Sequence, residues 1–255
     1  MDSHLNELAL KELLYRIADD LLILGHRNSE WTGIGPLLEE DIAFSSMAQD
    51  KIGQSLALYE LLHQLGEREP DVVAFMRNAD QFHNCQFVEL PIGGYEFSLI
   101  RHFLYDHSLF LRFQALSNSS YEPLAALSRK LVGELRYHVL HASTFIKQLG
   151  TATEESISRL QSSLNEAIPY SLGIFEPSPY EKELIDDGIF SGEQELFHQW
   201  WSVVNEILGK TALEISQVDQ ELAKTGGRLG QHTEHLQPLL DEMSEVIKLD
   251  PSAEW

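Results

Sequence analysis

Most of the chain consists of segments in which apolar residues recur every three or four positions, a spacing that gathers them on one face of an α-helix. Alternation of apolar and polar residues between hairpin turns, the signature of a half-buried strand, is not evident. The pattern therefore predicts an all-α protein. We expect long helices at about 5–27, 37–65, 96–117, 123–149, from 153 onward, 191–224 and 237–248, and a short one at 69–78.

Turn and capping residues indicate where these helices begin and end. Gly66 is expected to cap the C-terminal end of the second helix, because glycine adopts the left-handed conformation at low cost. Pro123 suits a first helical turn, where its missing N–H has no partner in any case. Ser191 is expected to cap a long helix that runs to about Lys224.

The spacing of the first four long helices predicts how they pack. The link between the second and third helices is longer than the links inside each pair, which indicates two helical hairpins joined by a crossover. This is the ferritin-like four-helix arrangement. We expect one ferritin-like domain over residues 1–255, with a core bundle at about 5–149 and additional C-terminal helices at about 153–248.

Composition narrows the classes of partner. The 18 Lys and Arg residues against 40 Asp and Glu residues give a net charge of -22, which repels nucleic acids and anionic membrane surfaces. No apolar run approaches the length of a membrane span, and the start of the chain lacks the pattern of a signal peptide. A single cysteine, Cys85, excludes an internal disulfide. We expect a cytoplasmic protein.

Each of the four bundle helices carries one acidic residue within an apolar face. These residues are Asp19, Asp50, Asp106 and Glu134. The two acids of the first hairpin are 31 residues apart and those of the second are 28 residues apart, so the two hairpins have similar spacings. Ferritin-like di-metal proteins use such carboxylates together with a Glu-x-x-His pair on two of the helices. A di-metal ancestry is one reading of this pattern, and chance in a chain rich in acids is the other.

The histidines of a di-metal site are missing from the expected spacing. Gly53 stands three residues after Asp50, and Tyr137 stands three residues after Glu134. His138 follows one position later, about 100° further around the helix, and is the alternative ligand. We therefore expect degenerate metal positions and no metal or other cofactor in this chain.

A carboxylate in an apolar stripe needs a partner, because burying it unpaired costs several kcal/mol. This applies most to Asp106, which shares its helix face with leucine and phenylalanine side chains. The candidate bases for the acid cluster are Lys51, Arg16, His102, His138 and His141.

Five segments give the chain a resemblance to a known family. They are SEWTG at 29–33, DKIGQ at 50–54, DQFHN at 80–84, ELRYH at 134–138 and TGGRLGQHTEHLQPLLDEM at 225–243. The chain resembles the C subunits of bacterial phenylacetyl-CoA epoxidases over nearly its whole length. The last segment is the most distinctive of the five.

The resemblance implies a role inside a larger assembly. In that family the fold is ferritin-like, and a catalytic A subunit holds the di-iron centre and binds the CoA thioester. A small B subunit and an NADPH-dependent reductase complete the system. The C subunit packs against the A subunit as a structural partner, so this chain is expected to be a non-catalytic subunit. A homo-oligomer of the isolated chain is left open.

Two other functions remain open at this stage. The first is an active ferritin-like di-metal oxidase or oxygenase that uses Asp19, Asp50, Asp106, Glu134 and His138 as ligands. The second is a small-molecule binding module in an old metal cavity, which close helix packing around Ala43, Gly53 and Ala57 would exclude.

The loop from Thr225 to His235 also has more than one interpretation. Its glycines suit a phosphate or CoA contact, and its histidines suit a metal. It follows a helix and lacks the lysine of a phosphate-binding loop, so we expect a tight turn whose His and Glu side chains bind backbone groups and fix the last helix. Trp200 and Trp201 are expected to belong to the core.

Overall fold

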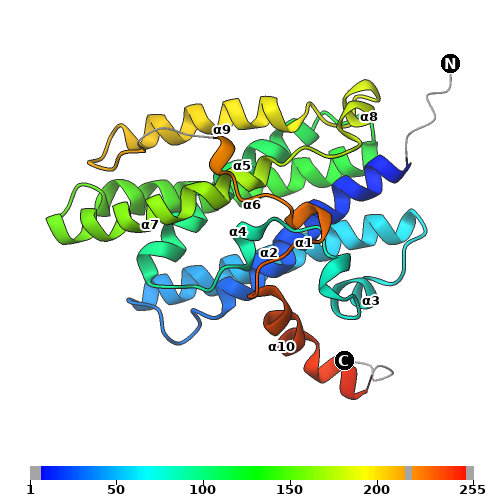
Figure 1. Ribbon diagram of the computed structural model, residues 1–255, viewed down its shortest axis with the longest axis horizontal. Coiled ribbons are helices and arrows are strands. Elements are labelled where there is room, and N and C mark those ends of the chain that lie inside the picture. The colour runs from blue at the N-terminus through cyan, green and yellow to red at the C-terminus, as the bar shows by residue number, and fades with distance from the viewer. Residues whose placement is uncertain (1–6, 216–219, 251–255) are drawn as a thin grey trace. The chain divides into compact units, whose positions relative to one another are not determined.

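The structure is a computed structural model that describes residues 7–215 and 220–250 (Figure 1). All regular elements in these two ranges are helical, which confirms the predicted fold class. The helices are α1 (Glu7–Ser29), α2 (Leu38–Gln64), α3 (Pro70–Phe75), α4 (Gln86–Glu89), α5 (Tyr95–Leu116), α6 (Glu122–Leu149), α7 (Glu154–Leu172), α8 (Glu181–Asp186), α9 (Glu193–Leu208) and α10 (Leu236–Leu249). Short 3-10 turns are η1 (Ala79–Gln81), η2 (Gly173–Phe175), η3 (Gln220–Leu222) and η4 (Gly227–Leu229).

The described residues separate into two compact units. Unit 1 contains residues 7–10, 92–215 and 220–225, and unit 2 contains residues 11–91 and 226–250. Unit 2 is therefore built from two segments that lie far apart in the sequence. The prediction that the whole chain is one ferritin-like domain stays a prediction.

Unit 1 is organised around α5. Within this unit α5 packs against α6, α7 and α9, and these helices lie side by side in Figure 1. Every residue of α5 from Phe97 to Leu109 is buried, so this helix has no solvent face over that stretch. The Nε1–H of Trp200 on α9 donates to the carbonyl of Leu104 at 2.8 Å, which confirms Trp200 as a core residue.

Unit 2 is organised around the contact between α1 and α2. A Cβ added at Gly25 of α1 would lie 2.8 Å from the side chain of Ile52, so glycine at this position allows α2 to approach closely. The hydroxyl of Ser55 also donates to the carbonyl of Ala18 across the two helices at 2.8 Å. We expected close packing around Ala43, Gly53 and Ala57; Ala43 is buried, but for Gly53 the expectation was wrong. Gly53 is exposed, and the close approach occurs at Gly25.

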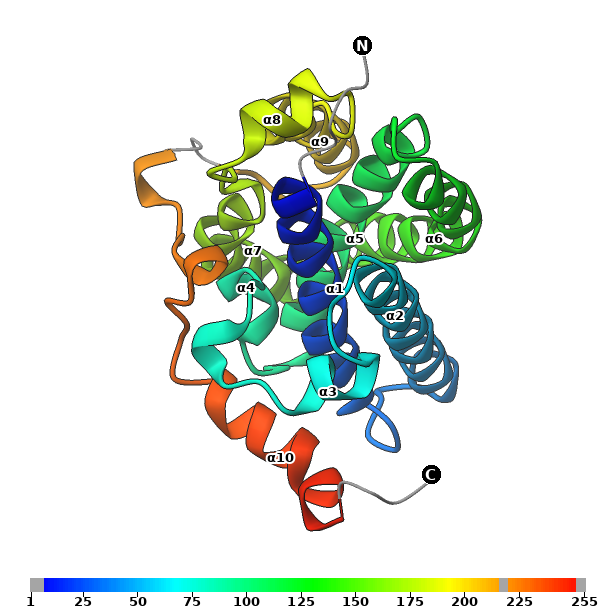
Figure 2. The same ribbon diagram turned by 90° about the vertical axis from the view of Figure 1, so that its right-hand side faces the viewer.

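The remaining elements of unit 2 come from both segments. The last helix, α10, contacts α3 and η1, and Figure 2 shows it beside the part of the chain that contains α3. The connection between residues 79 and 91 contains η1 and the single turn α4. The loop that precedes α10 packs against these short elements.

Most helix ends agree with the predictions from capping residues. Gly66 has φ +90°, and its N–H donates to the carbonyl of His63 at 2.9 Å, as a C-terminal cap requires. Pro123 lies in the first turn of α6. The Thr153 hydroxyl accepts a hydrogen bond from the Ser156 N–H at 3.2 Å and caps α7.

The helix predicted from Ser191 to Lys224 is shorter than expected. It starts after Gly192, and it ends at Leu208, before Gly209. Beyond Gly209 the N–H of Ala212 donates to the carbonyl of Gly150 at 2.9 Å, so the chain bonds to the end of α6 and leaves the helical path. Part of the predicted helix, residues 216–219, lies outside the described residues.

Within the part of the chain that the structure describes, no helix combines the length and the apolar character that crossing a membrane requires.

Candidate functional site

Asp19, the first predicted acid, is enclosed in unit 2 by hydrogen-bond donors. Both of its carboxylate oxygens accept from the guanidinium of Arg77, one of them at 3.0 Å. The hydroxyl of Tyr59 donates to the same carboxylate at 2.6 Å, and the backbone N–H of His83 donates at 2.8 Å. Asp19 is fully buried and Arg77 nearly so, which makes this a buried ion pair with added hydrogen bonds.

The pKa values of two neighbours of Asp19, Tyr59 and Arg77, are shifted in this environment. Burial is the main cause that raises the pKa of Tyr59 well above its ordinary value, and the charge of Asp19 adds to the increase. Burial is the largest single effect on Arg77 and lowers its pKa, but the charge and hydrogen bond of Asp19 together with Tyr59 and Tyr15 outweigh it, so the pKa is raised. Tyr59 therefore stays a neutral donor and Arg77 a cation, so Asp19 keeps both partners.

Asp50 does not occupy the position on α2 that faces Asp19. The α2 residue bonded to Asp19 is Tyr59, which follows Asp50 by nine residues, or about 13 Å along the helix axis. Asp50 is half-buried, and Gly53 is exposed. The predicted ligand position at Gly53 therefore points out of unit 2.

Asp106, the third predicted acid, lies in unit 1 and has the partner that its apolar stripe required. The Nδ1 atom of His102, one turn earlier on α5, is hydrogen-bonded to the Asp106 carboxylate. The other ring nitrogen of His102 is 3.2 Å from Nδ1 of His141 on α6. Nδ1 of His138 on α6 lies 3.7 Å from the Asp106 carboxylate. A buried carboxylate and three imidazoles thus form one cluster.

The structure corrects the prediction for the ELRYH segment. Tyr137 is 52% exposed, whereas His138 is fully buried beside Asp106. The inward position that we assigned to Tyr137 thus belongs to His138, because the rotation of α6 turns residue 138 toward α5. Glu134, one turn before His138, is half-buried.

The contacts of these residues do not fit a di-iron centre. Such a centre takes about four carboxylates and two imidazoles with free donor atoms. Both oxygens of Asp19 already accept from Arg77, and His102 uses its two nitrogens on Asp106 and His141. Across residues 7–215 and 220–250, no group of three or more His, Cys, Asp or Glu residues has an arrangement that could hold a metal ion.

A second buried ion pair in unit 2 was missed by the sequence analysis. Arg228 of η4 donates from both terminal nitrogens to the carboxylate of Asp20, at 2.9 and 2.8 Å. It also donates to the carbonyls of Arg16 at 3.1 Å and His83 at 3.0 Å. This one side chain ties the distinctive C-terminal segment to α1. The available signals in the sequence were an arginine within the glycine-rich stretch GGRLG and a second acid, Asp20, directly after Asp19 in an apolar helix.

Cys85 belongs to the same network. Its backbone N–H donates to Asp20 at 2.7 Å, and its side chain is buried. Burial, followed by the charge of Asp20, raises the pKa of the thiol above its ordinary value. The thiol is therefore held in its protonated, unreactive form.

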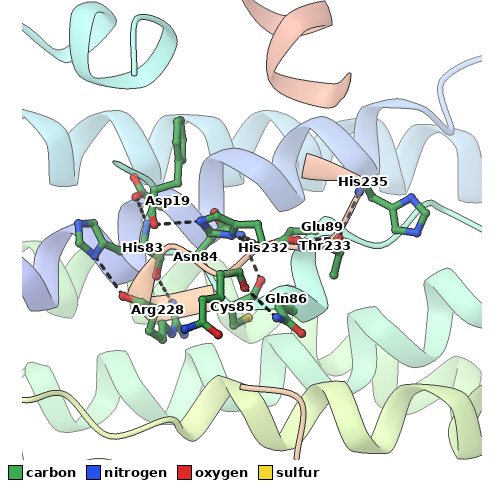
Figure 3. Close-up of polar contacts among 12 residues, drawn as sticks. Asp19, His83, Asn84, Cys85, Gln86, Glu89, Arg228, His232, Thr233 and His235 are labelled. Atoms are coloured by element: carbon green, nitrogen blue, oxygen red, sulfur yellow. Dashed lines mark hydrogen bonds and ion pairs between the residues drawn. The ribbon is translucent and has the colours of Figure 1, made fainter. Parts of the chain in front are cut away.

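Glu89 anchors the rest of the C-terminal loop, as Figure 3 shows. This fully buried carboxylate contacts Nδ1 of His232 at 2.6 Å and accepts from the amide of Asn84 at 2.9 Å. It also accepts from the N–H and the hydroxyl of Thr233, both at 2.7 Å. The carbonyl of Glu89 accepts from Arg27 at 2.7 Å, and Arg27 also reaches the carbonyl of His235 at 3.3 Å.

The glycines of this loop serve close packing against the chain itself. A Cβ added at Gly227 would lie 2.6 Å from the carbonyl oxygen of Asn84, and one at Gly230 would lie 2.8 Å from that of Asp80. His232 reaches the carbonyl of Phe82 at 3.2 Å, as the tight-turn interpretation predicted. The same interpretation was wrong for Glu234, whose side chain is 86% exposed. The backbone that would approach a phosphate is thus covered by residues 80–86.

Comparison with known proteins gives two findings. A family model described as phenylacetic acid catabolic protein matches residues 2–255. The chain is also similar to the C subunit of 1,2-phenylacetyl-CoA epoxidase from Escherichia coli (strain K12), with 31% identity over 241 residues. That match covers 94% of this chain and 96% of the relative.

Proposed function

We propose, from the premise that this chain belongs to the phenylacetic acid catabolic protein family, that it is a non-catalytic structural subunit of a bacterial ring-1,2-phenylacetyl-CoA epoxidase complex. Its task is to bind and stabilise the catalytic A subunit, which holds the di-iron centre, in aerobic phenylacetate degradation. A small B subunit and an NADPH-dependent reductase complete the proposed assembly.

One observation carries the non-catalytic role. The carboxylate of Asp19, at the predicted ligand position of α1, is bonded on both oxygens to Arg77 and also accepts from Tyr59 and His83. A metal at this position would have to displace a buried guanidinium, and separating a buried ion pair leaves an uncompensated charge that costs about 3–5 kcal/mol. The relative's name as a subunit, matched along nearly its full length, supports the assembly role.

The test measures both the co-purification of this chain with the A subunit and the epoxidase activity of the complex. We expect a tagged A subunit, when it is co-expressed with this chain, to retain it through purification at moderate salt. We expect the purified pair, with the B subunit and the reductase, to epoxidise phenylacetyl-CoA with NADPH and O2. The change Glu134→Gln in this chain should leave that rate within about twofold, because Glu134 does not hold the metal in the proposed scheme.

One variant serves as the control for this test, and two outcomes would contradict the proposal. Glu122→Gln, at an exposed acid on the same helix, controls for loss of surface charge. Loss of activity in Glu134→Gln with the complex intact would support the active di-metal oxidase instead. Two tightly bound irons per isolated chain, measured by metal analysis after growth in iron-replete medium, would overturn the non-catalytic role.

A further inference from the structure

Along most of α2 the exposed positions are uncharged, and the half-buried acids Asp41 and Asp50 flank them. Between Glu40 and Tyr59, every exposed residue of this helix is uncharged. We call this surface the α2 seam, and its members are Ile42, Ser46, Gln49, Ile52, Gly53 and Leu56. Three of the six are large aliphatic residues, and Ile42 is 59% exposed. At the N-terminal end of the helix, Leu37 and Leu38 are also mostly exposed.

An uncharged surface of this length is unusual for this protein. The chain has 58 charged side chains among its 255 residues, and exposed helix faces normally carry such residues. The exposed face of α10 follows the rule, with Asp241, Glu242 and Glu245. Water alone gives no reason for α2 to exclude charge, whereas a protein interface does, because its centre is depleted of charged residues.

The spacing of the seam matches helix-to-helix packing. Ile42, Ser46, Gln49, Gly53 and Leu56 follow one another at intervals of four, three, four and three residues. This is the repeat of a helix that packs lengthwise against another helix at a small crossing angle.

Gly53 indicates how closely the second helix approaches. Outside its own helix backbone and chain neighbours, no described heavy atom lies within 4 Å of a Cβ added at this position. Glycine in a helix interior is destabilising relative to alanine, and contacts among the described residues do not require it here. Open space alone does not assign a partner to a helical glycine, since Gly133 of α6 also has it, but Gly53 lies in the middle of the seam, where glycine allows a neighbouring backbone to come close.

We propose that the α2 seam is the docking surface for an uncharged, apolar face of one helix of the catalytic A subunit. This proposal rests on the proposed function for the existence of that partner, and it adds the surface by which the partner is held. Ile42, Ile52 and Leu56 insert between side chains of the partner helix, and Gly53 admits its backbone or a large side chain.

A second copy of this chain fits the seam poorly. In an antiparallel pairing centred on Gln49, the exposed Glu39 of one copy would approach the exposed Glu60 of the other. In a parallel pairing each acid would approach its own equivalent. Two chains that each carry a net charge of -22 also repel one another. A different protein can instead present neutral or basic residues to these acids.

The experiment measures the affinity of the isolated chain for the purified A subunit by calorimetry, with three variants. Ile42→Lys places a charge in the seam, and Gly53→Gln fills the open space with an uncharged helix-forming residue. We expect each to weaken binding about tenfold or more. Val246→Lys, at a comparably exposed apolar residue of α10, is the matched control and should bind as the unmodified chain does.

Folding and binding are separated by a second measurement. Because Gly53 has open space within the chain, Gly53→Gln should keep or raise the thermal midpoint of the isolated chain while it weakens binding. Equal affinity of Gly53→Gln and the unmodified chain for the A subunit would refute the α2 seam as the docking surface, and it would not contradict the proposed function. A loss as large in Val246→Lys as in Ile42→Lys would refute the α2 seam too. Failure of the unmodified chain to bind the A subunit would instead refute the proposed function.

Discussion

Arg228 and Asp20 show how much a single buried pair can determine in this protein. The two side chains are 208 residues apart in the sequence, and both are almost inaccessible to solvent. Two parallel hydrogen bonds give their contact a fixed geometry, which a lysine could not reproduce. The pair fixes η4 against α1, and through η4 the loop that leads to α10.

Replacing Arg228 by leucine should therefore be strongly destabilising. The change leaves the Asp20 carboxylate buried without its counter-ion, which costs about 3–5 kcal/mol in the free energy of unfolding. Urea denaturation followed by circular dichroism measures the loss. The double change Asp20→Leu with Arg228→Leu should recover most of it, because no unpaired charge remains.

An exposed pair supplies the contrast. Arg129 contacts Glu122 on the surface, where the two side chains are 50% and 75% exposed. Arg129→Leu should cost less than about 1 kcal/mol, since solvent screens exposed ion pairs. Equal costs for Arg129→Leu and Arg228→Leu would show that burial does not govern the strength of the Arg228 pair.

At the scale of elements, glycine has opposite roles at two helix positions. Gly66 ends α2 in the left-handed conformation, with φ +90°. Gly133 lies inside α6, is exposed, and has no described atom outside its own helix within 4 Å of an added Cβ. Sequence patterns identify the first kind of glycine readily, because it coincides with the end of an apolar repeat.

Alanine at these two glycines should change stability in opposite directions. Gly66→Ala forces a side chain into a left-handed backbone and should lower the free energy of unfolding by about 1–2 kcal/mol. Gly133→Ala should raise it by roughly 0.5–1 kcal/mol, because alanine loses less backbone freedom in a helix. Thermal unfolding of the two variants compares them directly, and a shift of the same sign in both would contradict this account.

At the scale of the whole molecule, the net charge of -22 opposes the folded state. Repulsion among surface acids is long-ranged at low ionic strength and short-ranged at physiological salt, since the Debye length falls from about 30 Å to about 8 Å. We expect the thermal midpoint to rise as sodium chloride is increased from about 0.01 to 0.3 M. Potassium chloride should act equally. A falling midpoint would mean that attractive surface pairs outweigh the net repulsion.

Local patterns in the sequence determined the helical class, most helix ends and the need of Asp106 for a partner. These features depend on periodicity, capping and the cost of a buried charge, all of which act over a few residues. The same patterns placed the partner of Asp106 correctly among the candidates, because His102 is one helical turn away.

Only the tertiary structure decided which residues complete each buried carboxylate. Arg77 reaches Asp19 from 58 residues away, Arg228 reaches Asp20 from 208, and His232 reaches Glu89 from 143. It also decided that His138 and not Tyr137 faces Asp106, because the rotation of α6 about its own axis is set by packing against α5. Periodicity gives the relative phase of residues on one helix, but the absolute orientation of that helix depends on contacts between segments distant in sequence.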